Sequence, residues 1–164
     1  MEHEGFWLYE TQAILRYIDQ VFDGPCLIPS EPKAAARMQQ VMNITDWYVT
    51  TSITNGISWN RVVAPIFGLA TDESAVEAAI PQGRTCVAAL EEILGSNPYF
   101  AGDQLTLADI MAFAHIDFMP RSMEGSDLLA GSTLLPWLER MSVRESARRT
   151  ATELLMGLET ARAA

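Results

Sequence analysis

One stretch, residues 99–118, constrains the fold of this chain more than any other. Within it, Thr106 is a good N-cap residue, because its hydroxyl can accept a hydrogen bond from a free N–H of the first helical turn. Asp109 stands three residues later, at the partner position of a capping box, where a carboxylate also suits the positive end of the helix dipole. Leu105 and Ile110 have the spacing of a hydrophobic staple. The sequence therefore predicts a helix that begins directly after Thr106.

This predicted helix is apolar on most of its circumference, which is typical of a helix buried inside a helical domain. Its apolar residues are Ile110, Met111, Phe113, Ala114 and Phe118. His115 lies on the same element, and we interpret it as a core or groove histidine with a hydrogen-bond partner and no catalytic role. Pro120 ends the helix.

Apolar residues recur at helical spacing in most of the remaining chain. They predict helices from Glu10 to a stop at Asp23-Gly24-Pro25, from about Lys33 to Pro65, over 72–94, around Trp137 and over 145–161. Gly56 is expected to loosen the second of these helices, and Pro81 to kink or break the third. Loops are expected over 65–72 and 125–133. Because almost every segment is helical, the predicted fold class is all-α.

Length, net charge and residue counts exclude several kinds of partner and site. A chain of 164 residues is long enough to bury a core without disulfides or metals. Its net charge of −10 repels phosphate backbones and anionic lipid, so nucleic acid is not an expected partner. No apolar run reaches membrane-spanning length, and the first residues lack the features of a signal peptide. Cys26 and Cys86 are isolated, and two histidines are too few for a metal site. A cytoplasmic domain without a metal or membrane segment is expected.

Three segments resemble, in the same order and at similar spacing, the C-terminal two-thirds of a cytosolic-type glutathione transferase. They are LYETQAILRYID at 8–19, NPYFAGDQLTLADI at 97–110 and LLPWLERMSVRESARRT at 134–150. No single segment is decisive, but together they cover the length of the chain. The resemblance implies a remnant of a thioredoxin-like domain over 1–23, a linker over 24–32 and the all-helical C-terminal bundle over 33–164.

A possible binding site lies at the start of the first helix. Glu10 and Thr11 place a carboxylate and a hydroxyl beside free N–H groups that attract anions, which suits the ammonium and carboxylate of an α-amino acid. By resemblance, that group is the γ-glutamyl end of glutathione; alternatively, Thr11 only caps the helix. Asn43 and Asp46 share one face of the next helix. The resemblance implies that a polar residue near here reaches the same group across a dimer, but both residues could equally be solvated.

The aromatic residues of the second helix have two interpretations. By resemblance, Trp47, Tyr48 and Trp59 line the pocket for the hydrophobic co-substrate; alternatively, they belong to the core. The resemblance also implies that Asp109 holds the fold together and takes no part in chemistry.

The chain departs from the family at its start. In the family, a Tyr, Ser or Cys early in the thioredoxin-like domain stabilises the glutathione thiolate. We find no segment of that kind, assign no catalytic residue and expect little or no activity from this chain alone. Residues 6–22 are expected to present an unpaired strand and an uncovered helix face, which would need a partner. Whether the chain is a truncated product, has a mispredicted start or is a natural remnant stays open.

Two functions follow from the resemblance. The first is that of a glutathione transferase homologue, which conjugates glutathione, its co-substrate, to small electrophilic molecules as a homodimer. The alternative is a non-catalytic interaction or assembly module of the same fold. A plain helical bundle that shares only the capping motif is disfavoured, because three separate segments match.

Overall fold

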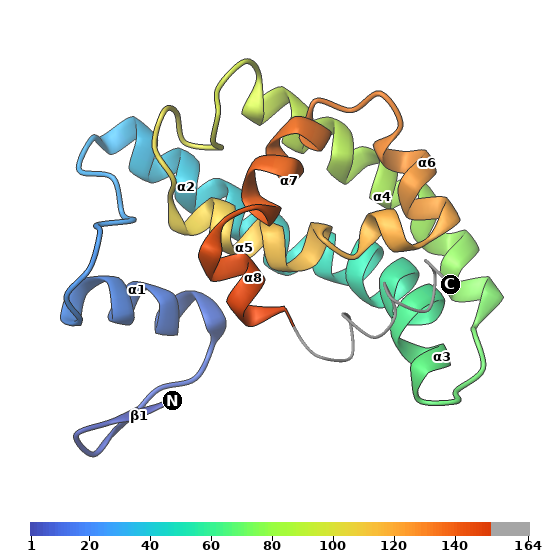
Figure 1. Cartoon of the computed structure of the whole chain (residues 1–164), viewed down its shortest axis with the longest axis horizontal. Coiled ribbons are helices and arrows are strands. Elements are labelled where there is room, and N and C mark those ends of the chain that lie inside the picture. Colours follow the sequence, from blue (N-terminus) through green and yellow to red (C-terminus); the bar gives the residue numbers. More distant parts are fainter. Residues whose placement is uncertain (152–164) are drawn as a thin grey trace.

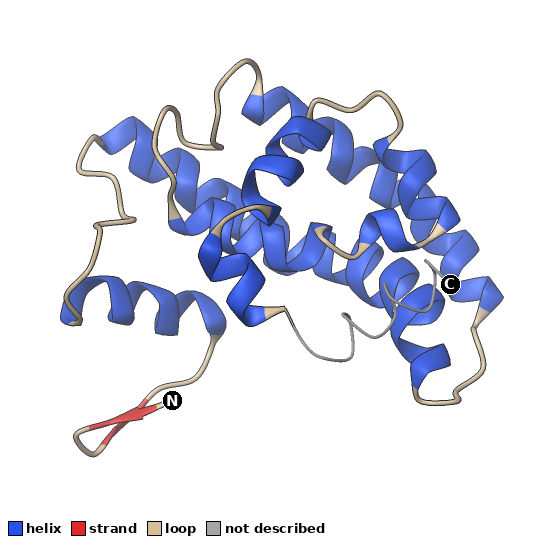
Figure 2. Ribbon diagram, viewed as in Figure 1, coloured by secondary structure: helices blue, strands red, loops and turns tan. Residues whose placement is uncertain are grey.

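The computed structural model describes residues 1–151, and these are almost entirely helical, as the sequence predicts (Figures 1 and 2). The elements in chain order are β1 (Glu2–His3), β2 (Phe6–Trp7), α1 (Thr11–Val21), α2 (Pro32–Ile44), η1 (Thr45–Val63), α3 (Ala64–Ile66), α4 (Glu73–Leu94), α5 (Leu107–Ile116), η2 (Met119–Arg121), α6 (Met123–Leu129), α7 (Leu134–Ser142) and α8 (Glu145–Thr150). Here η1 is a π-helix and η2 a 3₁₀-helix. Within the described residues, no helix is long and apolar enough to cross a bilayer.

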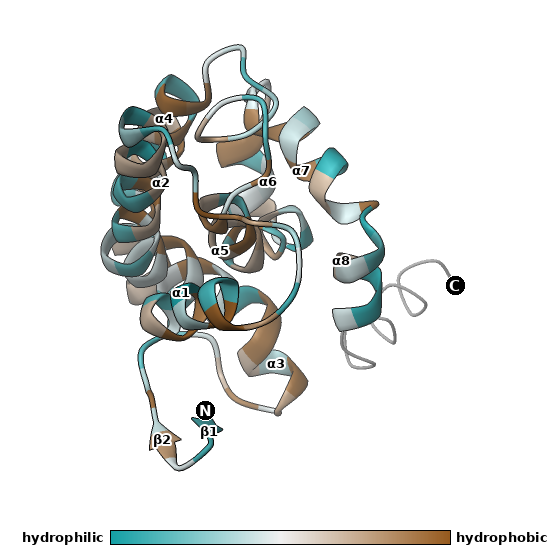
Figure 3. Ribbon diagram, turned by 90° about the vertical axis from the view of Figure 1, so that its left-hand side faces the viewer, coloured by the Kyte–Doolittle hydropathy of each residue, from teal (hydrophilic) through white to brown (hydrophobic). Residues whose placement is uncertain are grey.

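Helix α5 lies in the middle of the helical body (Figure 3). It packs against α2, η1 and α7, and its inward residues are buried: Leu107, Ala108, Asp109, Met111, Ala112 and Ile116. The core also contains Met38 and Met42 of α2, Ile53 of η1 and Leu90 of α4. The apolar circumference predicted for this helix is therefore explained by its central position.

The capping box at the start of α5 is present, with Thr106 as the N-cap residue. The Asp109 carboxylate accepts hydrogen bonds from the backbone N–H and the hydroxyl of Thr106, both at 2.9 Å. It also accepts from the N–H of Phe100 and the indole Nε1–H of Trp137, both at 3.0 Å. Burial raises the pKa of Asp109, while these four hydrogen bonds act in the opposite direction. One buried carboxylate thus joins the loop before α5, the start of α5 and helix α7.

The two predicted staple residues, Leu105 and Ile110, are both half-buried and pack against the hydrophobic core. They therefore contribute apolar contact on either side of the capping box.

Helix α2 continues without interruption into η1, which has the wider turns of a π-helix. At its end the N–H of Ala64 donates to the carbonyl of Trp59, five residues earlier. Gly56 does not loosen this helix: a Cβ atom there would lie 2.3 Å from the Cβ of Ala79, so the glycine lets η1 and α4 approach closely. The helical path also runs one residue past Pro65, which stands in the first turn of α3, where proline is tolerated.

Three further expectations differ from the structure or reach beyond its described residues. Helix α4 runs unbroken through Pro81, so the predicted break is absent. The predicted loop over 125–133 is wrong in its first half, because α6 extends to Leu129. Ser122 caps α6 by accepting from the N–H of Gly125, and Gly125 lies so close to the Met119 backbone that no side chain would fit. The last predicted helix begins at Glu145 as expected, but residues 152–161 of it lie outside the described part.

The first residues form a hairpin to one side of the helical body (Figure 1). The prediction of an unpaired strand is wrong, because Phe6–Trp7 pairs antiparallel with Glu2–His3. The connecting residues Glu4 and Gly5 both have positive φ, of 51° and 82°, as a tight two-residue hairpin turn requires. Helix α1 follows and has no buried residue. Its apolar residues Ile18 and Val21 are 42% and 48% exposed, which agrees with the expected uncovered helix face.

Candidate functional site

Glu10 and Thr11 lie exposed at the start of α1. Glu10 is the N-cap residue and Thr11 the first helical residue, so Thr11 does not act as the cap. The Glu10 side chain makes no capping hydrogen bond, and its φ of 71° is a conformation that costs free energy for a residue with a Cβ. The Glu10 carboxylate therefore does not cap the N–H groups of the first turn, and the side chains of Glu10 and Thr11 are exposed.

A hydrogen-bond network joins this end of α1 to the junction of α2 and η1. The Gln12 amide donates to Oδ1 of Asn43 at 3.2 Å and to Oδ2 of Asp46 at 2.5 Å. Gln39 donates to Oε1 of Gln12 at 2.6 Å and to Oδ1 of Asn43 at 3.1 Å. Arg16 of α1 donates to Gln39 at 3.1 Å. The structure thus brings the four predicted glutathione-binding residues to one region, with Gln12 next to Thr11 in the chain and bonded to Asn43 and Asp46.

His115 lies on α5, where its Nδ1 atom is 2.8 Å from the hydroxyl of Thr54 on η1. Burial lowers the pKa of His115, and the negative charge of Asp46 acts in the opposite direction. The interpretation of His115 as a hydrogen-bonded core or groove residue is confirmed. Its side chain links α5 to η1, the element that carries Asp46.

A comparison with known families identifies the helical part of the chain. Residues 73–140, which run from the first turn of α4 into α7, match the family described as "Glutathione S-transferase, C-terminal domain". Residues 73–140 therefore have the sequence of a glutathione S-transferase C-terminal domain. The resemblance seen in the sequence is therefore confirmed, and so is the all-helical class with a small strand-containing segment before it.

Relatives extend the similarity toward the start of the chain. Glutathione S-transferase F14 of Arabidopsis thaliana is 29% identical over 155 residues, which cover 92% of this chain and 61% of the relative. Human glutathione S-transferase theta-2B is 33% identical over 115 residues, 68% of this chain and 46% of the relative. The chain thus spans about half to three-fifths of the length of the curated relatives it matches.

Solved structures of glutathione transferases are also similar to this chain. A structure of human glutathione transferase theta-2 in complex with glutathione and an unknown ligand has a TM-score of 0.77 and 28% identity. The similarity covers 98% of this chain and 68% of the human structure, so it extends well beyond residues 73–140. Glutathione transferase F7 of Populus trichocarpa has a TM-score of 0.81 over 94% of this chain and 73% of its own, at 24% identity, and supports the fold.

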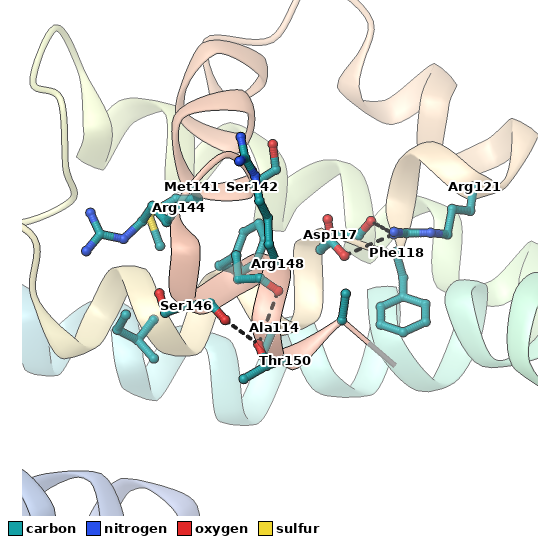
Figure 4. A pocket seen from close by; sticks show the side chains of 14 residues that line it. Ala114, Asp117, Phe118, Arg121, Met141, Ser142, Arg144, Ser146, Arg148 and Thr150 are labelled. Atoms are coloured by element: carbon teal, nitrogen blue, oxygen red, sulfur yellow. Dashed lines mark hydrogen bonds and ion pairs between the residues drawn. The ribbon is translucent and has the colours of Figure 1, made fainter. Parts of the chain in front are cut away.

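The three aromatic residues assigned to the co-substrate pocket of the transferase are exposed on η1. Trp47, Tyr48 and Trp59 have 73%, 56% and 45% of their surface accessible, so the alternative that they belong to the core is wrong. They do not line the cavity of the helical domain between α5 and α8 (Figure 4). Their contact with a co-substrate stays a prediction.

Sequence reasoning missed Gln12, Gln39 and Arg16 as members of the site. Some signal was present, because Gln12 and Arg16 lie four residues apart on the polar side of α1. Gln39 likewise precedes Asn43 by four residues on α2. Which polar face of α1 meets which polar face of α2 depends on the path of the linker, and local spacing does not give that path.

Proposed function

We propose that the protein takes part in glutathione conjugation, and that Glu10, Thr11, Asn43 and Asp46 bind the γ-glutamyl end of glutathione. The observation that carries this proposal is the contact of Gln12 with Asn43 and Asp46, which brings two regions more than 30 residues apart to the start of α1. Similarity to transferases along nearly the whole chain supports it.

The chemistry of these residues suits the γ-glutamyl group. Its ammonium would lie between the carboxylates of Glu10 and Asp46, as charge-assisted hydrogen bonds require. Its carboxylate would meet the Thr11 hydroxyl and the free N–H groups at the N-terminus of α1. In this proposal Asn43 and Asp46 act at the α1 of their own chain, and their hydrogen bonds with Gln12 of that helix support this arrangement.

The reaction also needs a thiolate and an electrophile. In this proposal all four residues bind the γ-glutamyl end of glutathione and not its thiol, so we infer that the thiol-activating group comes from outside this set. The exposed Trp47, Tyr48 and Trp59 are proposed to contact the hydrophobic electrophile in an assembled homodimer. This chain alone is expected to conjugate glutathione no faster than the uncatalysed reaction, a prediction that a standard conjugation assay checks directly.

The binding proposal is tested by calorimetric titration of reduced glutathione into the purified chain. The Glu10→Ala, Thr11→Ala double variant removes both proposed contacts, and Gln20→Ala on the same helix is the matched control, because its exposed side chain lies outside the network. We expect saturable binding to the wild type and to the control, and its loss in the double variant.

Equal binding by the double variant would overturn the assignment of the site. An absence of heat at millimolar glutathione, which corresponds to binding weaker than about −4 kcal/mol, would overturn glutathione binding by this chain. The interaction module would then be the better account.

A further inference from the structure

The polar side chains between α1 and α2 form a relay of hydrogen bonds with a charged group at each end. Arg16 of α1 donates to Oε1 of Gln39 on α2 at 3.1 Å. The amide nitrogen of Gln39 donates to Oε1 of Gln12 and to Oδ1 of Asn43. The amide nitrogen of Gln12 donates in turn to Oδ1 of Asn43 and to Oδ2 of Asp46. Three neutral amides thus connect a guanidinium to a carboxylate.

The two charged ends fix the direction of every amide in this relay. A guanidinium only donates hydrogen bonds and an ionised carboxylate only accepts them, whereas an amide can turn either its oxygen or its nitrogen toward a neighbour. If the Gln39 amide were turned over, its nitrogen would face the Arg16 guanidinium, and two donors would meet. Gln12 would then have to turn as well and would set its oxygen against the Asp46 carboxylate. Only the observed direction gives each donor an acceptor.

This direction decides what Asn43 and Asp46 offer to a ligand. The Oδ1 atom of Asn43 already accepts from Gln12 and Gln39, whereas its Nδ2 group makes no hydrogen bond within residues 1–151. Asp46 uses Oδ2 for Gln12, and its Oδ1 atom has no partner in the same residues. Both side chains are exposed. The pair therefore presents an N–H donor, which suits a carboxylate, beside a carboxylate oxygen, which suits an ammonium.

We propose that Arg16 and Gln39 are positioning residues, which orient Asn43 as a donor to the α-carboxylate of the γ-glutamyl group. This inference rests on the proposed glutathione site and adds to it a source of specificity for that carboxylate. Arg16 has no ion pair within residues 1–151, so the oxygen of Gln39 is the acceptor that its guanidinium finds there. Arg16 and Gln39 act through Asn43 and make no contact with the ligand themselves.

The variant Gln39→Glu reverses the direction of the relay with little change in side-chain shape. The new carboxylate keeps an oxygen for Arg16 but replaces the N–H donor by an acceptor, which faces the oxygens of Gln12 and Asn43. Asn43 restores a hydrogen bond only by turning its nitrogen inward, and it then presents its oxygen to the ligand.

Gln40→Glu is the matched control for this variant. It adds the same charge at the next position of α2, where the Gln40 oxygen accepts from Arg37 at 2.8 Å and takes no part in the relay. Any loss of affinity caused only by added negative charge on α2 would therefore occur in this control as well.

Two ligands separate the carboxylate from the rest of glutathione. One is reduced glutathione, and the other is 4-aminobutyryl-cysteinylglycine, which lacks only the α-carboxylate; each is titrated into the chain and followed by NMR. We expect Gln39→Glu to bind glutathione roughly tenfold more weakly, as the loss of a hydrogen bond to a charged group implies. It should bind the analogue as tightly as the wild type does, and Gln40→Glu should match the wild type for both ligands.

Two substitutions of Arg16 test its part in the relay. Arg16→Gln introduces an amide that can donate or accept, so it no longer fixes the direction, and glutathione should bind more weakly while the analogue does not. Arg16→Lys restores a group that only donates, and because one N–H reaches Gln39, a lysine should recover most of the affinity.

Solvent exchange of the Asn43 side-chain amide protons, measured by NMR without ligand, tests the direction of the relay by itself. We expect fast exchange in the wild type and in Gln40→Glu, and slower exchange in Gln39→Glu, where these protons donate to the new carboxylate. Slow exchange in the wild type, or no slowing in Gln39→Glu, would overturn the proposed direction.

The titrations decide the role of the carboxylate. An equal loss of affinity for both ligands in Gln39→Glu, or an equal loss of glutathione affinity in Gln40→Glu, would overturn the orientation of Asn43 as the source of specificity. If the wild-type chain does not bind glutathione, the proposed glutathione site itself is overturned, and the exchange rates still decide the direction of the relay.

Discussion

Replacement of Asp109 by alanine should destabilise the chain more than any other single change at a polar residue. The substitution leaves three buried N–H donors without an acceptor, from Phe100, Thr106 and Trp137. At about 1–3 kcal/mol for each unsatisfied donor, the loss would be roughly 3–9 kcal/mol. Part of this is returned, because burial raises the pKa of Asp109 and the variant no longer buries a carboxylate. We therefore expect a loss in the lower part of this range, about 3–5 kcal/mol.

Urea unfolding followed by circular dichroism measures this loss. With a slope of about 2 kcal/mol per molar urea, the midpoint should fall by roughly 2 M. Asp103→Ala is the matched control, because Asp103 is an exposed aspartate in the loop just before the same helix. Its midpoint should move by less than the equivalent of about 0.5 kcal/mol.

The reasoning fails if Asp109→Ala lies within about 1 kcal/mol of the wild type, since a single unsatisfied buried donor would cost that much. It also fails if Asp109→Asn equals the wild type. An asparagine keeps one oxygen for Phe100 and Trp137 but turns an NH₂ donor toward the N–H of Thr106, so its stability should lie between the two.

Three further predictions concern packing, pH and the ligand site. Gly56→Ala should cost about 1–3 kcal/mol of stability by overpacking against Ala79, whereas Gly24→Ala, where a Cβ has open space, should not; urea midpoints compare the two. His115 has a pKa lowered below its ordinary 6.5 by burial, so its contribution to stability is complete above pH 6.5 and falls as pH drops through the folded pKa; His115→Gln should flatten the change in urea midpoint between pH 7.5 and 5.5. Gln12→Ala should weaken glutathione binding in calorimetry, because Asn43 and Asp46 lose the donor that positions them.

The sequence predicts the central helix correctly because its signals are local. A hydroxyl, a carboxylate three residues later and an apolar residue on each side define the start of α5 within six positions, 105–110. The structure adds contacts between residues that lie far apart in the sequence, which local spacing does not predict. The partners of Asp109 include Trp137, 28 residues away, and only the packed fold brings them together.

The errors have physical causes of the same kind. Gly125 looks like a loop residue, but it is a helical glycine that lets α6 pass close to the backbone of Met119. Gly56 looks like a weak point, but it allows close contact between η1 and α4. Strands β1 and β2 have two residues each, which is too short for any alternation to be visible. In each case the residue is known from the sequence, but the backbone or side chain that packs or pairs with it is known only from the structure.

The capped helix and the proposed glutathione site are connected through η1. His115 of α5 contacts Thr54 on this helix, and Asp46 at its start contacts Gln12 of α1. The position of α5 therefore helps to set where Asp46 stands, although Asp109 itself touches no proposed ligand. This arrangement predicts that stability and affinity respond to different residues.

Asp109→Asn should lower the urea midpoint strongly, yet at 10 °C, where the variant remains folded, its glutathione affinity should change little. Gln12→Ala should do the reverse. It should lower affinity, while it removes only exposed or partly buried hydrogen bonds, each worth about 0.5–1.5 kcal/mol. Calorimetry and urea unfolding on the same two proteins provide the test. A parallel loss of affinity and stability in both variants would mean that binding reports only the fraction of folded chain, and that Gln12 has no positioning role.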